Sequence, residues 1–187
     1  DQSRFAHSVG VFILLKKYGA SLEEQIAGLI HDVSHSAFSH CIDYVLPAGS
    51  EKSHDHQDNI FESFIRKTEI PEIIRRHGLD LNKILDDDNW PLKETNLPDL
   101  CADRIDYILR TAVNFEEITP GELDGYLDNL KAENNQWIFQ SADIARHFAE
   151  MFSKINSEYF SGLDSAVMFR AVGDCLKHSF AIKYINE

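Results

Sequence analysis

The chain has 187 residues and a mass of 21.4 kDa, the size of one domain with a helical extension. Its 31 acidic and 18 basic residues give a formal net charge of −13, which argues against a surface for extended nucleic acid. No apolar run reaches the roughly 18 residues that a membrane-spanning helix needs, so we expect no membrane partner. Three scattered cysteines without a CxxC pair predict reduced thiols and a cytoplasmic location. The first residue is Asp1, not Met, so we expect a segment upstream.

Helical periodicity dominates the first half of the chain. In residues 3–18 the apolar stripe is predicted to contain Phe5, Val9, Phe12 and Ile13. A Ser-Leu-Glu-Glu capping box predicts that the second helix starts near Ser21. The expected elements up to residue 89 are helices at 3–18, 21–33, 60–65, 71–78 and 80–85, a loop with a short helix at 35–46, and polar loops at 50–58 and 86–89.

The second half predicts longer helices and one hairpin. Asn134 and Asn135, followed by Trp137-Ile-Phe, predict a small β-hairpin near residues 130–139. Helices are expected at 98–114, 120–130, 142–160 and 164–184. The predicted fold is therefore all-α, with a core at residues 1–115 and a helical extension at 116–187. This extension is expected to pack on its own core, and packing in a homo-oligomer is the alternative.

The second predicted helix carries an adjacent histidine and aspartate, His31 and Asp32. Leu22, Leu29 and other apolar residues form one face, whereas Ala27, Gly28, His31 and Asp32 form the other. Such a helix is normally buried. A buried carboxylate beside an imidazole must be paired or must hold a metal ion. The first helix adds Arg4 and His7, which lie three residues apart and on the same side.

The helix at 98–114 separates into an apolar and a polar face. Its polar face allows two interpretations: a solvated stripe with ion pairs such as Asp106–Arg110, or the wall of a site. Its apolar face contains Cys101, Ala102, Ile105, Ile108, Leu109 and Ala112, and its polar face contains Asp103, Arg104, Tyr107, Arg110, Thr111 and Asn114.

The histidines gather in one part of the sequence and favour the second interpretation. Six of the nine histidines lie between His31 and His77, and five of these lie within residues 31–56. Their spacing is not the HExxH of zinc proteases, and no CxxC pair accompanies them as in a structural zinc site.

Four ordered blocks together resemble a known family. They are Arg4-Phe-Ala-His7, His31-Asp32, the run His35-Ser-Ala-Phe-Ser-His40, and Asp103-Arg-Ile-Asp106-Tyr107-Ile-Leu-Arg110. The pattern resembles the HD superfamily of metal-dependent phosphohydrolases, and most of all its deoxynucleoside triphosphate triphosphohydrolase branch. It covers residues 3–114 and implies an HD-domain helical bundle with hydrolase activity.

The resemblance implies a metal centre and a supporting catalytic site. The metal ligands fall on His7, His31, Asp32 and Asp103, around one divalent ion that could be Fe, Mn, Co, Ni, Zn or Mg. The supporting residues fall on His35, His40 and Asp43, with a further histidine from a downstream His-Glu pair. That pair is not reproduced here. His54, followed by an aspartate, is preferred over His56, and either would protonate the leaving group.

The resemblance also implies substrate contacts. Arg4 and Arg104 match residues that hold phosphates, Tyr107 matches a residue beside the sugar, and Arg110 belongs to the same set. Thr111 stands where this branch usually has an aspartate that recognises the deoxyribose hydroxyl. The expected partner is thus a small phosphorylated substrate, and a nucleotide in any phosphorylation state is the class we expect. The alternatives are hydrolysis of another phosphomonoester or phosphodiester, and a non-catalytic nucleotide-sensing module.

Overall fold

The structure is a computed structural model that describes residues 3–46, 49 and 54–185. It consists of helices and one two-stranded antiparallel sheet, which confirms the predicted all-α class with a small hairpin. The chain forms two compact units: unit 1 contains Asp1–Asp32 and Ile73–Ile155, and unit 2 contains Val33–Glu72 and Asn156–Glu187. The predicted boundary at residue 115 lies inside unit 1, and the division into a core and an extension stays a prediction. Among the described residues, no helix has the length and apolarity needed to cross a bilayer.

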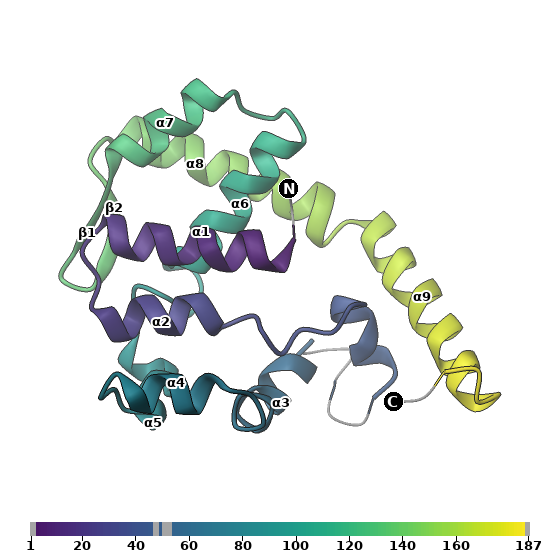
Figure 1. The fold of residues 1–187 in the computed structure, drawn as a ribbon. Coiled ribbons are helices and arrows are strands. Elements are labelled where there is room, and N and C mark those ends of the chain that lie inside the picture. The colour runs from purple at the N-terminus through teal and green to yellow at the C-terminus, as the bar shows by residue number, and fades with distance from the viewer. Residues whose placement is uncertain (1–2, 47–48, 50–53, 186–187) are drawn as a thin grey trace. The chain divides into compact units, whose positions relative to one another are not determined.

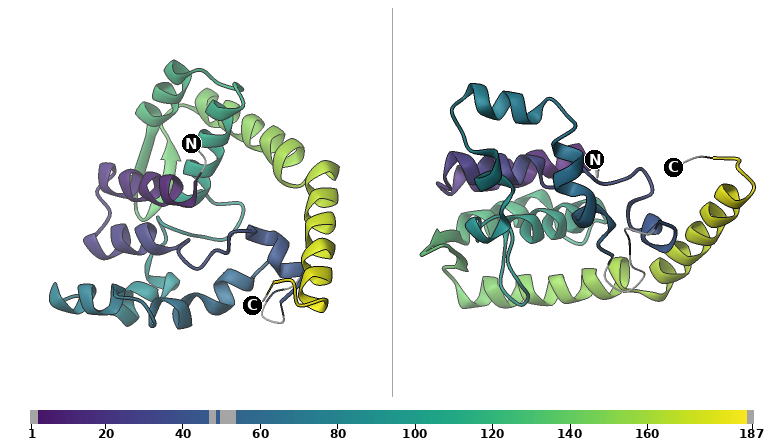
Figure 2. Two further views of the ribbon diagram at one scale, coloured as in Figure 1. Left: turned by 45° about the vertical axis from the view of Figure 1, so that its right-hand side comes forward. Right: turned by 90° about the horizontal axis from the view of Figure 1, so that it is seen from below.

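Unit 1 starts with two packed helices, α1 (Arg4–Lys17) and α2 (Leu22–Ile30), which lie side by side in Figures 1 and 2. Ser3 and Ser21 cap their N-termini by accepting a hydrogen bond from a backbone N–H three residues later. A Cβ on Gly28 would lie 2.5 Å from a methyl of Leu15, so the glycine allows the close approach of the two helices.

The predicted apolar stripe of α1 is wrong. Phe5 is 78% exposed and Ile13 is 53% exposed. The buried side of α1 instead contains His7, Ser8, Val11, Leu14 and Leu15. The reason is that polar side chains on this side find partners inside the unit, so the face with fewer large apolar groups turns inward.

The central helix of the unit is α6 (Ala102–Asn114), and its predicted apolar face is buried. It starts four residues later than the predicted Pro98, because Cys101 is the N-cap and accepts a hydrogen bond from the backbone N–H of Arg104. Glu24 of α2 fixes the segment before α6, since its buried carboxylate accepts hydrogen bonds from the backbone N–H groups of Leu92 and Lys93.

The rest of unit 1 surrounds these helices. Helix α7 (Pro120–Asn129) begins with a capping box of Thr119 and Glu122. The hairpin pairs β1 (Leu130–Glu133) with β2 (Gln136–Phe139) through a two-residue turn, in which both asparagines have positive φ. The remaining elements are the short helices α5 (Leu81–Leu85) and η2 (Asp87–Asn89), the last turns of α4 (Ile70–Arg76), and α8 (Ala142–Ile155).

Unit 2 is built on η1 (Ser39–Tyr44), α3 (His56–Ile65) and α9 (Leu163–Ala181), with a π-helical turn, η3 (Asn156–Phe160), before α9. Helix α9 packs along η1, as Figure 2 shows in both views. Cys41, Ile42 and Leu176 form the buried core between them.

The predicted loop at residues 50–58 and the predicted helix at residues 142–160 also differ from the structure. Helix α3 begins at His56, so the last part of the loop predicted at residues 50–58 is helical, and residues 50–53 lie outside the described residues. The predicted helix at residues 142–160 is divided, because α8 ends at Ile155 and a π-helical turn follows.

Candidate metal centre and histidine cluster

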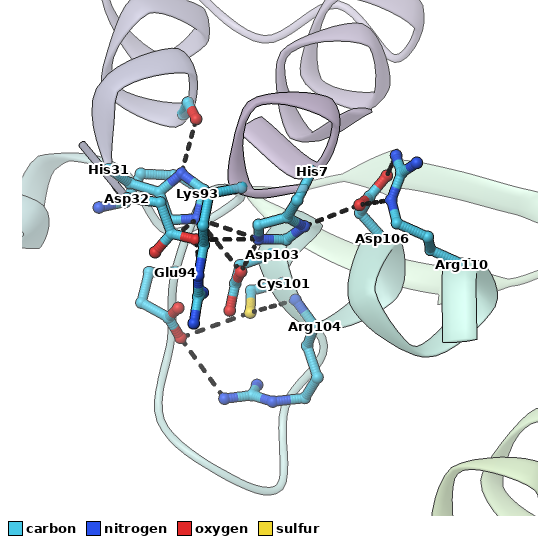
Figure 3. Close-up of polar contacts among 12 residues, drawn as sticks. His7, His31, Asp32, Lys93, Glu94, Cys101, Asp103, Arg104, Asp106 and Arg110 are labelled. Carbon is cyan, nitrogen blue, oxygen red and sulfur yellow. Dashed lines mark hydrogen bonds and ion pairs between the residues drawn. The ribbon is translucent and has the colours of Figure 1, made fainter. Parts of the chain in front are cut away.

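Three side chains from three helical segments of unit 1 meet at one point. His7 comes from α1, His31 follows α2, and Asp103 lies in the first turn of α6 (Figure 3). The Asp103 Oδ1 atom lies 2.8 Å from His7 Nε2 and 3.2 Å from His31 Nε2, and the two Nε2 atoms are 3.3 Å apart. These three atoms have the mutual distances expected of ligands that share one metal ion.

The opposite ring nitrogen of each histidine is held by an acceptor. His7 Nδ1 lies 2.8 Å from Asp106 Oδ2, and His31 Nδ1 lies 2.7 Å from the carbonyl oxygen of Gly28. A carbonyl or carboxylate oxygen can only accept, so each Nδ1 carries the proton. In the neutral rings both Nε2 lone pairs therefore face the common centre, which is the tautomer that metal binding requires.

Asp32 completes the predicted set. Its carboxylate oxygens lie 3.7 Å from His7 Nε2 and 3.7 Å from His31 Nε2. Arg4 donates a hydrogen bond of 2.8 Å from Nη1 to Asp32 Oδ2, although the arginine side chain is 45% exposed. The structure thus brings all four predicted metal ligands together, with one predicted phosphate-binding arginine at their edge.

The electrostatics of the cluster also suit a cation. Burial lowers the pKa of His7, but hydrogen bonds and charges of Asp103 and Asp106 raise it to about 9 overall. Burial would raise the pKa of Asp103, whereas hydrogen bonds from His31 and His7 hold it well below its ordinary value. Two imidazoles and two carboxylates so close together need either a proton or a metal ion between them. Their N and O donors fit a divalent transition metal or Mg²⁺.

Asp106 and Arg110 form a layer behind His7. Arg110 donates hydrogen bonds of 3.0 Å from Nε and Nη2 to the two oxygens of Asp106 (Figure 3). A third hydrogen bond goes from its Nη2 to the carbonyl oxygen of Ala6. Gly10 leaves room for this pair, because a Cβ there would lie 1.9 Å from Asp106 Oδ1. The pair is only partly a surface feature, since Asp106 is buried. The role of Asp106 toward His7 was not predicted, and the i,i+4 spacing alone could not reveal it.

Arg104 is held by the segment that precedes α6. Its guanidinium donates to the carbonyl oxygens of Asp99 and Thr95 and contacts Glu94 Oε1 at 3.4 Å. Burial, together with the charge of Asp103, raises the pKa of Glu94. Glu94 was not predicted as a site residue, because it lies before α6 and no helical periodicity marks its position. A role of Arg104 in phosphate binding would have to compete with these contacts.

The other predicted substrate residues lie on the same helix. Tyr107 is partly buried, and burial together with the charge of Asp103 raises its pKa to about 12, so the phenol stays protonated. Thr111 is buried and only 6% exposed. Arg110 contacts Asp106 and Ala6 as described above, so its predicted substrate contact and those of the other residues stay predictions.

Unit 2 brings a second group of predicted residues together. Asp43 Oδ2 lies 3.3 Å from His40 Nδ1 and 3.6 Å from His54 Nδ1, and Asp43 Oδ1 accepts a 2.8 Å hydrogen bond from the backbone N–H of His56. The ring of His35 packs edge-on against His40, with a centroid distance of 5.2 Å. Of the two alternatives, His54 places its ring beside Asp43. His56 contributes its backbone to Asp43, while its own side chain is buried.

Comparison with known proteins gives the family. The HD domain model matches residues 4–111, which contain all four residues of the metal cluster. The chain belongs to the HD domain family. HD domains bind a divalent metal ion, in agreement with the predicted cofactor and with the His–Asp cluster described above.

Three relatives extend this comparison. The uncharacterized protein YdhJ of Bacillus subtilis is 42% identical over 84% of this chain and 48% of its own length. The metal-dependent phosphohydrolase cns2 of Cordyceps militaris is 38% identical over 77% of this chain and 39% of its own length. A deoxynucleoside triphosphate triphosphohydrolase SAMHD1 homolog of Dictyostelium discoideum is 26% identical over 77% of this chain and 33% of its own length. This HD domain chain thus spans about half or less of the length of these relatives.

The fold has a counterpart among solved structures. The crystal structure of a hypothetical protein from Aquifex aeolicus superposes with a TM-score of 0.67 and 23% sequence identity. The superposition covers 95% of this HD domain chain and 52% of the other chain, and it supports the fold.

Proposed function

We propose that this HD domain is a metal-dependent phosphohydrolase whose substrate is a nucleotide. The observation that carries the proposal is the convergence of His7 Nε2, His31 Nε2 and Asp103 Oδ1 within 3.3 Å of one another, with each Nδ1 satisfied from behind. The cns2 protein, named as a metal-dependent phosphohydrolase, supports the reaction class. The Dictyostelium protein, named as a deoxynucleoside triphosphate triphosphohydrolase homolog, supports a nucleotide.

The proposed roles follow from the contacts of unit 1. His7, His31, Asp32 and Asp103 would hold the ion, which when bound supplies positive charge to a phosphate and lowers the pKa of a water. Arg4 lies beside Asp32 with its side chain half exposed, so its guanidinium is placed to stabilise negative charge on phosphate oxygens. Asp106 fixes the His7 ring through Nδ1 and is itself fixed by Arg110.

The proposed proton donor lies in unit 2. His54 would give a proton to the departing oxygen, and the buried Asp43, which also contacts His40, would orient that imidazole. His54 is preferred over His56 because its ring nitrogen Nδ1 lies 3.6 Å from Asp43 Oδ2, whereas the contact of His56 with Asp43 is through the backbone N–H. His35 would support His40 through their ring contact.

Product analysis tests the proposal directly. Protein loaded with Mn²⁺ is incubated with nucleoside and deoxynucleoside triphosphates, a nucleoside monophosphate and a cyclic dinucleotide, and the products are separated. Triphosphate release indicates attack at the α-phosphorus of a triphosphate, and inorganic phosphate from the monophosphate indicates a phosphomonoesterase. Opening of the cyclic diester indicates a phosphodiesterase. Nucleotide binding without any product would favour the sensing module.

One matched pair of variants links turnover to the cluster. Asp103→Ala removes the carboxylate that contacts both histidines, so it should abolish turnover and lower the metal content. Asp143→Ala is the control, because this carboxylate lies on α8 of the same unit and is 82% exposed. Full turnover by a folded Asp103→Ala protein would overturn the assignment.

A further inference from the structure

The triad of His40, Asp43 and His54 in unit 2 has an unusual hydrogen-bonding state. Asp43 is buried, with its side chain only 2% exposed, and one oxygen is satisfied by the backbone N–H of His56. Its other oxygen faces both imidazoles. His54 Nδ1, also buried, has no hydrogen-bond partner among the described residues. A buried ring nitrogen without a partner costs free energy, so a ligand that satisfies it is expected.

The distances in the triad fit ligands around an ion better than direct hydrogen bonds. The Asp43 oxygen lies 3.3 Å from His40 Nδ1 and 3.6 Å from His54 Nδ1, whereas good N–H···O hydrogen bonds measure about 2.7–3.2 Å. A tetrahedral zinc ion with ligand bonds of about 2.0–2.1 Å separates its ligand atoms by about 3.3–3.4 Å. The Asp43 oxygen already lies at nearly this distance from each ring nitrogen, and ligand atoms of all three residues lie within 4.8 Å of one another.

The surroundings hold the triad in place. The His54 ring packs against His40, Tyr44 and Phe169, with centroid distances of 5.5, 5.9 and 6.0 Å. Its backbone has a φ of 55°, in the left-handed region that non-glycine residues rarely adopt. The side chains of His40 and His54 remain about one-third exposed, so an ion can reach the donors from solvent.

We infer that His40, Asp43 and His54 form a second metal site, distinct from the cofactor site of unit 1, for a borderline divalent transition ion such as Zn²⁺. Two imidazoles and one carboxylate suit zinc, cobalt or nickel, whereas Mg²⁺ and Ca²⁺ prefer sets made only of oxygen. Three protein ligands leave a fourth position for a water molecule.

Occupancy of this site would also regulate the enzyme, a consequence that rests on the proposed function. A zinc ion bound to Nδ1 of His40 and His54 would occupy the position of the Nδ1 proton, so neither ring could become an imidazolium. The Nε2–H that remains on such a ring is a much weaker acid toward the leaving group, so Zn²⁺ at the triad would oppose proton donation from the same rings. The ion would act as an inhibitor that leaves the metal centre of unit 1 loaded.

Metal titration tests the site without any substrate. Chelator-treated protein is titrated with Co²⁺, whose tetrahedral complexes absorb in the visible, and with Zn²⁺ in competition with an indicator dye. The wild type should bind two ions, Asp103→Ala one, and the double variant Asp103→Ala with His54→Gln none. His178→Gln is the control, because this histidine is exposed on α9 of the same unit and should leave both sites intact.

Two results would overturn the second site. One is an Asp103→Ala protein that binds no Co²⁺ at micromolar concentration. The other is a residual ion in Asp103→Ala that persists after His54→Gln and also after His40→Gln. If Asp103→Ala fails to fold, His31→Gln replaces it as the variant without the first site.

Activity provides the second arm of the test. Zn²⁺ added to Mn²⁺-loaded wild type should reduce turnover at least about tenfold, with Mn²⁺ still bound. Turnover that is unaffected by Zn²⁺ bound at the triad would overturn the regulatory role and leave the site itself standing. Absence of turnover under every condition would contradict the proposed function, whereas the Co²⁺ and Zn²⁺ titrations would still decide the site.

Discussion

The two His–Asp clusters contain the same residue types, but the hydrogen bonds that hold their histidine rings differ. In the metal centre of unit 1, His7 and His31 each have an acceptor on Nδ1, so both rings are fixed in the tautomer that points Nε2 inward. In the triad of unit 2, the carboxylate of Asp43 is fixed and His54 Nδ1 lacks a hydrogen bond. The difference therefore lies in the outer partners: Nδ1 of both rings is satisfied in the candidate metal centre, whereas Nδ1 of His54 in the triad is not.

The secondary structure that carries the two clusters also differs. Two of the proposed ligands lie within helices α1 and α6, whose N-termini are capped by side chains. The triad lies on the short helix η1 and on His54, which precedes α3 outside any regular element. A regular helix suits a ligand that must hold its geometry.

The largest expected effect is a loss of turnover without a loss of the metal ion. His54→Gln should reduce turnover about 10²–10⁴-fold, because it removes the proposed proton donor, and the metal content of unit 1 should stay unchanged. Steady-state kinetics on Mn²⁺-loaded protein, together with elemental analysis, measure both. His178→Gln should behave as the wild type. If His54→Gln retains full turnover, His56→Gln is the next variant, and activity in both would remove unit 2 from the reaction.

The outer partner of His7 gives the next effect. Asp106→Asn keeps the shape but removes the charge that fixes the His7 proton on Nδ1, so affinity for the metal ion should fall about 10–100-fold. Calorimetric titration with Mn²⁺ measures the change, and the ¹⁵N shifts of the His7 ring report its tautomer. Asp128→Asn is an isosteric control in the same unit. An unchanged affinity and tautomer would show that Asp106 has no positioning role.

The third prediction concerns the space that Gly10 leaves for the Asp106–Arg110 pair. Gly10→Ala places a methyl 1.9 Å from Asp106 Oδ1, so the pair must shift and the free energy of unfolding should fall by about 1–3 kcal/mol. Gly125→Ala in α7 meets no atom within 4 Å and should instead raise the free energy of unfolding, by up to about 1 kcal/mol. Urea unfolding of both variants measures this difference, and equal stabilities would contradict the crowding at Gly10.

The last prediction concerns the pH dependence of metal affinity. In the metal-free protein the pKa of His7 is raised to about 9, so below that pH the ion must displace a proton from the ring. Apparent affinity should therefore rise about tenfold per pH unit from about pH 7 to 9 and level off above. Calorimetry in buffers of different ionisation enthalpy should detect about one proton released per ion at pH 7.5. An affinity independent of pH in this range would contradict the raised pKa.

Sequence predicted the family through the resemblance of its four motif blocks, and the four residues expected as metal ligands come together in unit 1. The apolar face of α6 and the hairpin turn at Asn134–Asn135 followed from local patterns and are confirmed. The buried side of α1 was mispredicted, because apolar periodicity cannot see that His7 finds polar partners inside. Leu22 and Leu29 of α2 show the same limit, since they are 56% and 37% exposed while Ala27 and Gly28 are buried.

Contacts between residues far apart in the chain could not be predicted from the sequence. The contact of Asp106 with His7 joins positions 99 residues apart, and the i,i+4 pair with Arg110 resembled an ordinary surface pair. Glu24 was predicted only as part of a capping box, whereas its carboxylate also binds the backbone of Leu92 and Lys93. Such long-range hydrogen bonds depend on how the helices pack, and no local pattern encodes that packing.

The sequence separation of the metal cluster has a consequence for the abundance of the protein. His31 lies 24 residues from His7 and 72 residues from Asp103. An ion coordinated by all three would therefore link distant parts of the chain reversibly. An ion that binds only the folded state, at a concentration 100 times its Kd, adds about 2.7 kcal/mol to the free energy of unfolding. Scarcity of the ion would therefore deplete the folded protein itself, in addition to leaving the remaining molecules idle.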